Sequence, residues 1–146
     1  PTSEAVVVRL APVAISAFML VMGTAYDGFG RLDLASLAKL KGRPLLPVCP
    51  EVLGGLSIPR IPAEIQADGL TIQNREGRDV TARFRAGALA TLHLCQENGI
   101  RQAHLKDGSP SCGHTWIYDG SFHNRQISGQ GLTCGLLSET GIEIGG

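Results

Sequence analysis

Short apolar segments alternate along this chain with segments of helical periodicity, and this alternation limits the folds that the chain can adopt. The expected strands, bounded by proline or glycine, cover residues 13–17, 44–48, 100–105 and 142–144. The expected helices cover residues 33–40, 84–95 and 131–140. Strands that alternate with helices pair in parallel, and the helices cover the sheet. We therefore expect one α/β domain over residues 1–146, a Rossmann-like, three-layer fold with a mainly parallel central sheet.

The segments between these elements are rich in glycine and proline. Residues 52–65 contain two adjacent glycines and two prolines, which predicts an ordered loop without regular structure. A turn is expected at 74–77. Residues 107–113 (Asp-Gly-Ser-Pro-Ser-Cys-Gly) consist almost entirely of turn-forming residues, so a loop is expected directly after the third strand.

Length, charge and hydropathy exclude several classes of function. The 146 residues carry a net charge of +0 without a run of Lys or Arg, which argues against partners such as nucleic acid or a membrane surface. The longest apolar run, 11–22, is too short for a membrane-spanning helix, and Glu4 argues against a secretory signal. Four cysteines without a secretory context favour reduced thiols and a cytoplasmic protein.

Two of the four cysteines follow expected strands directly. Cys49 comes after the second strand, and Cys112 lies in the loop after the third. Ligands of open α/β sheets bind outside the carboxyl ends of parallel strands, so both thiols are expected at one crevice, together with Phe18 after the first strand. Spacing alone leaves open whether these are metal ligands or ordinary loop cysteines.

The other two cysteines fit the hydrophobic core. Cys95 shares the apolar face of the helix around 84–95, and Cys134 lies inside the last helix. Free cysteine is commonly buried as a small hydrophobic residue. We expect both side chains to lie away from the crevice.

The segments that carry the turns, the prolines and the two crevice cysteines form an ordered series from about Ile15 to Ile144. The series comprises Tyr26-Asp27-Gly28, Pro47-Val48-Cys49-Pro50-Glu51-Val52-Leu53-Gly54-Gly55-Leu56, Pro59-Arg60, Pro62-Ala63-Glu64-Ile65, Asp79-Val80-Thr81, Ser109-Pro110-Ser111-Cys112-Gly113, Ile117-Tyr118-Asp119-Gly120 and Gly131-Leu132-Thr133. In this series the chain resembles the family that contains the thiouracil desulfidases. The eight-residue block that begins at Cys49 is its most specific part.

The resemblance implies a desulfidase that carries a 4Fe-4S cluster on three cysteines, with one iron left open. Such an enzyme converts a thiolated nucleobase such as thiouracil into uracil and hydrogen sulfide without net redox change. By position, Cys49 and Cys112 match cluster ligands, and Glu51 and Ser109 match residues implicated in the chemistry. The resemblance also places Tyr26, Asp27 and Ser111 at the substrate.

The chain departs from the family pattern in its first segment. Phe18 stands where the family has its first cluster cysteine, Val21 where it has glycine, and Ala25 where it has a basic residue. A phenyl ring cannot ligate iron, whereas iron–sulfur clusters ordinarily have three or four protein ligands. Among the remaining residues, His114 is the nearest candidate for a replacement ligand.

Three functions remain open on the sequence. The first is iron–sulfur-dependent desulfuration of thiolated nucleobases or similar thioamides. The second is a cluster-free relative that binds such compounds without turning them over. The third is a thiol enzyme in which Cys49 or Cys112 carries sulfur as a persulfide, or in which the two thiols form a redox pair.

Overall fold

A four-stranded parallel sheet forms the centre of the computed structural model, which describes residues 12–17 and 42–145. Its strands are β1 (Val13–Ser16), β2 (Leu45–Val48), β5 (Gln102–His104) and β8 (Glu143–Gly145), in the spatial order β2-β1-β5-β8. All three pairings are parallel. The inner strand β1 is buried along its whole length, as its mainly apolar sequence predicts. The four expected strands are thereby confirmed.

Two helices, α4 (Thr81–Glu97) and α5 (Leu132–Glu139), pack against each other and complete the core with the sheet. The α4 residues that were expected to share one face are buried, among them Phe84, Ala88 and Cys95. The core also contains Cys134 of α5. Both helices therefore form where the periodicity of the sequence predicts them, and Cys95 and Cys134 are core residues as expected.

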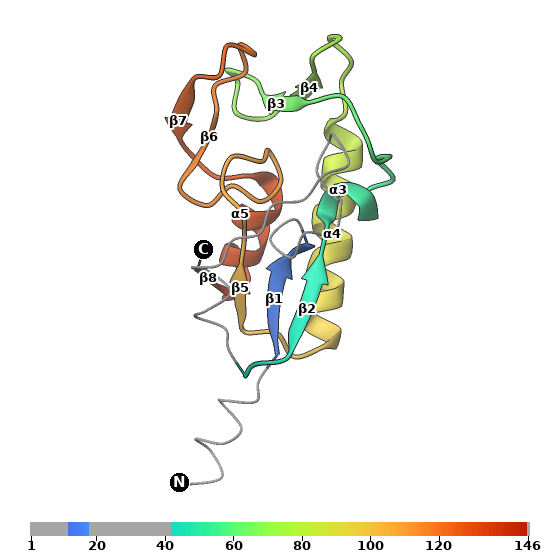
Figure 1. Cartoon of the computed structure of the whole chain (residues 1–146), viewed down its shortest axis with the longest axis vertical. Coiled ribbons are helices and arrows are strands. Elements are labelled where there is room, and N and C mark those ends of the chain that lie inside the picture. The colour runs from blue at the N-terminus through green and yellow to red at the C-terminus, as the bar shows by residue number, and fades with distance from the viewer. Residues whose placement is uncertain (1–11, 18–41, 146) are drawn as a thin grey trace, which may run out of the picture.

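Two antiparallel hairpins stand above the carboxyl ends of the sheet strands (Figure 1). One consists of β3 (Ala63–Ile65) and β4 (Ile72–Asn74), the other of β6 (Trp116–Tyr118) and β7 (Gln126–Ser128). The expected turn at 74–77 is present, with the Gly77 amide donating to the Asn74 carbonyl. Strands β3 and β6 contact each other, so the hairpins form a continuous roof over the sheet edge.

The expectation of an irregular loop over 52–65 is wrong at both of its ends. The short helix α3 (Pro50–Leu53) extends into it, and β3 closes it. Proline at the first helical position, Glu51 in the first turn and Gly54 at the carboxyl end stabilise α3 locally. Strand β3 forms because β4 is there to pair with it.

The fold is a mixed α/β domain with a central parallel sheet flanked by helices, as the alternation of strands and helices predicts. The helix expected over 33–40 lies outside the described residues, as do Phe18, Tyr26 and Asp27. Among the residues that the structure describes, every helix is too short or too polar to span a bilayer.

Candidate functional site

A cavity of about 850 Å³ lies between the carboxyl edge of the sheet and the two hairpins. Its floor comes from residues at the ends of β1 and β2 and from the loop after β5. Strands β3, β4 and β6 contribute Glu64, Asn74, Trp116 and Tyr118 to its walls. The cavity therefore occupies the crevice position that the topology of a parallel sheet provides for ligands.

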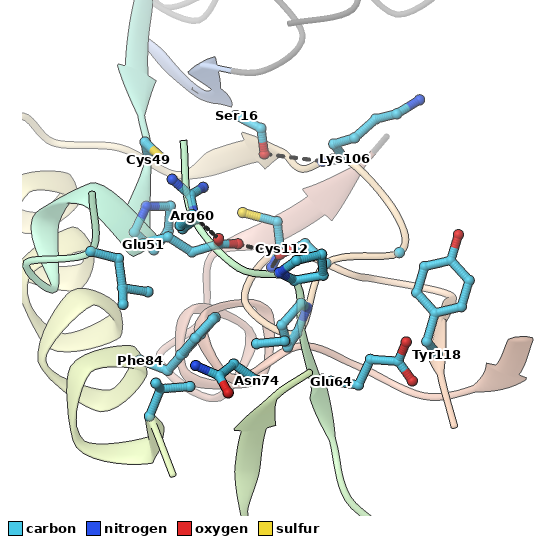
Figure 2. A pocket seen from close by; sticks show the side chains of 18 of the residues that line it. Ser16, Cys49, Glu51, Arg60, Glu64, Asn74, Phe84, Lys106, Cys112 and Tyr118 are labelled. Carbon is cyan, nitrogen blue, oxygen red and sulfur yellow. Dashed lines mark hydrogen bonds and ion pairs between the residues drawn. The ribbon is translucent and has the colours of Figure 1, made fainter. Parts of the chain in front are cut away.

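Cys49 and Cys112 both line this cavity (Figure 2). Cys49 is half-buried and holds the extended backbone position directly before α3. Cys112 is buried, and burial raises the pKa of its thiol to about 12; Glu51 and Cys49 add to the rise, and hydrogen bonds from Ser16 and Ser111 oppose it. Two thiols 63 positions apart in sequence, at 49 and 112, thus face one ligand space.

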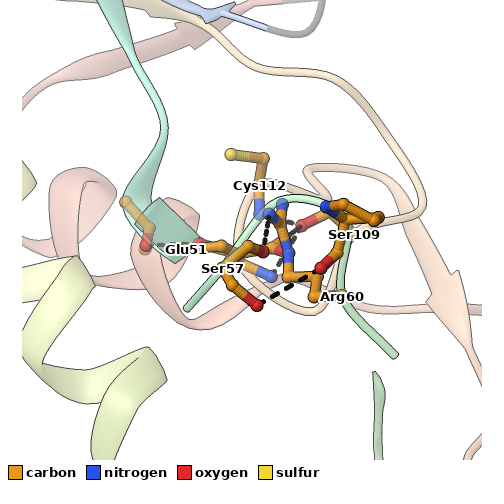
Figure 3. Close-up of polar contacts among 8 residues, drawn as sticks. Glu51, Ser57, Arg60, Ser109 and Cys112 are labelled. Atoms are coloured by element: carbon orange, nitrogen blue, oxygen red, sulfur yellow. Dashed lines mark hydrogen bonds and ion pairs between the residues drawn. The ribbon is translucent and has the colours of Figure 1, made fainter. Parts of the chain in front are cut away.

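Glu51 is held in the same cavity by two donors, one on each carboxylate oxygen (Figure 3). Arg60 Nε donates to Oε2 at 2.6 Å, and Ser109 Oγ donates to Oε1 at 3.0 Å. The side chains of Arg60 and Glu51 are only 8% and 16% exposed, so little water competes for this ion pair. The carboxylate is consequently fixed in orientation beside the two thiols.

Ser109 links Glu51 to the loop that carries Cys112. While its hydroxyl donates to Glu51, its oxygen accepts hydrogen bonds from the backbone N–H groups of Ser111, at 2.9 Å, and Cys112, at 3.0 Å. The proton of the hydroxyl is therefore directed toward the carboxylate. This arrangement fixes the Cys112 backbone and the Glu51 carboxylate relative to each other.

Asp107, the first residue of the same loop, bonds the residues that directly follow the loop. Its Oδ1 accepts the backbone N–H groups of His114 and Thr115 at 2.8 Å, and its Oδ2 lies 3.1 Å from His114 Nε2. Partial burial favours the protonated acid, but the backbone N–H and hydroxyl of Thr115 and the N–H groups of His114 and Trp116 outweigh it and lower the pKa of Asp107. His114 lines the cavity, and its ring is engaged by Asp107.

Of the residues that the sequence assigns to the site, the structure brings together Cys49, Cys112, Glu51 and Ser109. Ser111 is placed differently from these four residues. Its side chain is buried, its hydroxyl bonds Thr133 Oγ1 of α5 at 2.8 Å, and it is absent from the described lining of the cavity. In the described residues Ser111 anchors the loop, and its assignment to the substrate stays a prediction.

Two cavity residues were missed as functional candidates by the sequence analysis. Arg60 follows Ile58-Pro59, and Glu64 lies in β3. Both belong to segments that resemble the family, Pro59-Arg60 and Pro62-Ala63-Glu64-Ile65. That resemblance was the only signal available for them, because neither residue is near a cysteine in sequence.

The fold and the cavity define a class of protein: an α/β domain with a thiol pair and an oriented carboxylate at the carboxyl edge of its sheet. The family model described as 2-thiouracil desulfurase matches residues 13–145. This chain belongs to the 2-thiouracil desulfurase family.

Similar proteins cover most of the chain. The solved structure of a 4Fe-4S-dependent thiouracil desulfidase, TudS, superposes with a TM-score of 0.82 at 43% sequence identity, and the match covers 91% of this chain and 88% of that chain. YbbK, an uncharacterised protein of Bacillus subtilis (strain 168), is 40% identical over 104 residues, 66% of this chain and 69% of YbbK.

The cavity contains cysteines, the type of residue that binds iron–sulfur clusters, but fewer of them than a cluster ordinarily needs. Thiolates are the ligands that iron–sulfur clusters prefer, and Cys49 and Cys112 would supply two of them if both lost their protons. Within residues 12–17 and 42–145, no group of three or more His, Cys, Asp or Glu side chains is placed to hold a metal ion. A cluster with three protein ligands would therefore need one more ligand than these two cysteines provide.

Proposed function

We propose that this chain is built as a C–S bond hydrolase that removes sulfur from thiouracil-like nucleobases with the help of a 4Fe-4S cluster, and that Phe18 lowers the occupancy of this cluster in the unmodified chain. The observation that carries the proposal is the convergence of Cys49, Cys112 and the doubly held Glu51 carboxylate in one cavity. The proposed substrate is a small molecule, and the reduced state of the described cysteines fits a cytoplasmic protein.

Cys49 and Cys112 would hold the cluster on the cavity floor. When bound, such a cluster supplies a soft Lewis acid for a thiocarbonyl sulfur. The high pKa of the Cys112 thiol in the protein alone implies that metal binding must displace its proton. The same pKa disfavours Cys112 as the attacking thiolate of a persulfide enzyme.

Glu51 is the proposed general base. The reaction consumes one water and exchanges C=S for C=O: water forms the new C–O bond, the C–S bond breaks, and sulfur leaves as hydrogen sulfide with both protons of the water. No electrons are gained or lost. Glu51 would accept a proton from the attacking water, and Arg60 and Ser109 would keep its carboxylate aimed at the ring carbon.

Anaerobic reconstitution of the full chain and of Phe18→Cys tests this proposal. Iron and sulfide counts with a visible spectrum report the cluster, and conversion of 2-thiouracil to uracil reports activity. We expect little iron in the unmodified chain and a clear gain in Phe18→Cys, because a thiolate replaces a side chain that cannot ligate iron. Cys49→Ser in the Phe18→Cys background is the control and should lose the gain.

Each other outcome has a defined meaning. A full cluster in the unmodified chain would show that another group supplies the third ligand, with His114 the first to examine. Failure of Phe18→Cys to bind iron would contradict the assigned role of position 18. A mass increase of one sulfur on Cys49 or Cys112, without iron, would replace this proposal with a persulfide function.

A further inference from the structure

Glu64 is a buried carboxylate in the roof of the cavity, at a distance from the two thiols. Figure 2 shows it near Tyr118 and on the side of the cavity away from Cys49. It lies in β3 and is only 7% exposed. A carboxylate is costly to bury unless its oxygens are hydrogen-bonded. The partners of its two oxygens therefore indicate what Glu64 does.

One oxygen of Glu64 anchors the neighbouring hairpin. Oε1 accepts the backbone N–H groups of Gly120 at 3.0 Å and Phe122 at 3.1 Å. These residues form the turn between β6 and β7, where Phe122 and Asn124 have positive φ. Oε1 thus stabilises a strained turn, and its hydrogen-bonding capacity is largely used.

The other oxygen is left for the cavity. Oε2 of Glu64 accepts no hydrogen bond from the described residues, and Glu64 lines the cavity. The other two carboxylates of the described lining differ in this respect: Glu51 is paired with Arg60, and Asp107 with His114 and the amides of its loop. Glu64 therefore offers a ligand in the cavity an acceptor oxygen that no described residue bonds, whereas its other oxygen is occupied.

We propose that Oε2 of Glu64 accepts a hydrogen bond from the substrate, so that Glu64 determines which thiolated compounds bind. The donor is either a ring N–H of the thiolated base or, in a nucleoside, a hydroxyl of the sugar attached to that base. A cationic ligand is disfavoured, because the described lining contains more basic than acidic side chains: Arg60, Arg75, Arg78, Arg83 and Lys106 against Glu51, Glu64 and Asp107. This inference rests on the proposed function, since it assumes that a thiolated base enters the cavity.

The pairing of Oε1 makes Glu64→Gln a selective test. The two backbone N–H groups need an acceptor, so the amide oxygen of glutamine takes the place of Oε1 and its NH₂ group takes the place of Oε2. The hairpin anchor is retained, while the atom that faces the cavity changes from acceptor to donor. The NH₂ group of glutamine and the N–H or O–H of the ligand would then be two donors facing each other, which is repulsive. A site that bonds a ligand N–H or O–H discriminates strongly against such a mismatch.

Binding is measured by isothermal titration calorimetry on the anaerobically prepared full chain, with iron content determined for each sample. The ligands are 2-thiouracil, its 1-methyl and 3-methyl derivatives, and 2-thiouridine. If a ring N–H is the donor, Glu64→Gln weakens 2-thiouracil binding about 10- to 100-fold. The methyl derivative that lacks this N–H then binds both proteins equally. If a hydroxyl is the donor, only 2-thiouridine is affected.

The unmodified chain provides a second measurement that needs no variant. A ring N–H contact requires that one methyl derivative bind more weakly than 2-thiouracil, and a hydroxyl contact requires that 2-thiouridine bind more tightly. Glu97→Gln, an exposed position in α4, is the matched control and should leave every affinity unchanged. Trp116, the single tryptophan of the chain, lines the cavity and gives an independent fluorescence signal for occupancy.

Two negative results are distinguishable. Equal affinities of the unmodified chain and Glu64→Gln for all four ligands would overturn this inference and leave the proposed function standing. Failure of both the unmodified chain and reconstituted Phe18→Cys to bind any of the four would overturn the proposed function, and the role of Glu64 with it.

Discussion

Gly87 of α4 and Pro50 of α3 are in backbone contact: a Cβ atom on Gly87 would lie 1.8 Å from the Pro50 carbonyl oxygen. The contact is reciprocal, because a Cβ on Gly54, directly after α3, would lie 2.0 Å from the Arg83 carbonyl oxygen of α4. Glycine at both positions lets the two helices approach without side chains between them. Since Cys49 immediately precedes α3, this contact positions one of the two cavity thiols.

Gly87→Ala should therefore destabilise the protein by about 2–4 kcal/mol, because the added methyl group forces α3 away from α4. Gly135→Ala in α5 is the matched control. Its nearest neighbour would be 3.8 Å from the new Cβ, so it should be neutral or stabilising by about 0.5–1 kcal/mol. Urea unfolding of both variants measures the difference, and equal midpoints would contradict the close contact.

Glu51→Gln should lower desulfuration of 2-thiouracil about a hundredfold or more in whichever form carries the cluster. Glutamine keeps the shape of the side chain but cannot accept the proton of the attacking water. The visible spectrum and iron content should be unchanged, which separates loss of chemistry from loss of the cluster. Turnover equal to that of the parent protein would remove Glu51 from the mechanism.

Ser109→Ala should destabilise the loop around Cys112 by about 1–3 kcal/mol, because two backbone N–H groups lose their acceptor and Glu51 loses a donor. Ser57→Ala is the control, since the Ser57 hydroxyl makes one exposed hydrogen bond to the Pro59 carbonyl. The unfolding temperature should be lower for Ser109→Ala than for the parent protein and almost unchanged for Ser57→Ala. Identical unfolding temperatures would mean that the Ser109 contacts contribute nothing.

The lowered pKa of Asp107 predicts that the folded protein loses stability in acid. The pKa of Asp107 is lower in the folded protein than in the unfolded chain, so its contribution to stability is fully present above the unfolded pKa and is lost as pH falls through the folded pKa. Unfolding free energies of the parent and Asp107→Asn are compared between about pH 6 and pH 2.5. The difference in unfolding free energy between the parent and Asp107→Asn should become smaller below about pH 4. A constant difference in unfolding free energy across this pH range would show that Asp107 does not cause the loss of stability in acid.

Several elements of the fold follow from local sequence patterns. Short stretches of sequence predict helix α4 from its periodic apolar face and strands β1 and β2 from their apolar runs. The same reasoning correctly predicted that Cys95 and Cys134 lie in the core. These features are predictable because their signals lie within short stretches of the sequence.

Other features had no local signal. Strands β3, β6 and β7 are short hairpin strands that were not expected from the sequence, and they exist because partner strands pair with them. Ser111 is the instructive case among the site residues. It lies next to Cys112 in sequence, yet the backbone directs its hydroxyl to Thr133 of α5.

By itself the sequence determined the parallel α/β architecture and the convergence of Cys49 and Cys112, since the carboxyl ends of parallel strands share one edge. Only the tertiary structure decided how Glu51 is oriented and that Glu64 faces the cavity. Arg60 and Ser109 reach Glu51 from 9 and 58 positions away, and Gly120 and Phe122 reach Glu64 from 56 and 58. Contacts over such separations depend on the packing of whole elements, and no short pattern in the sequence encodes them.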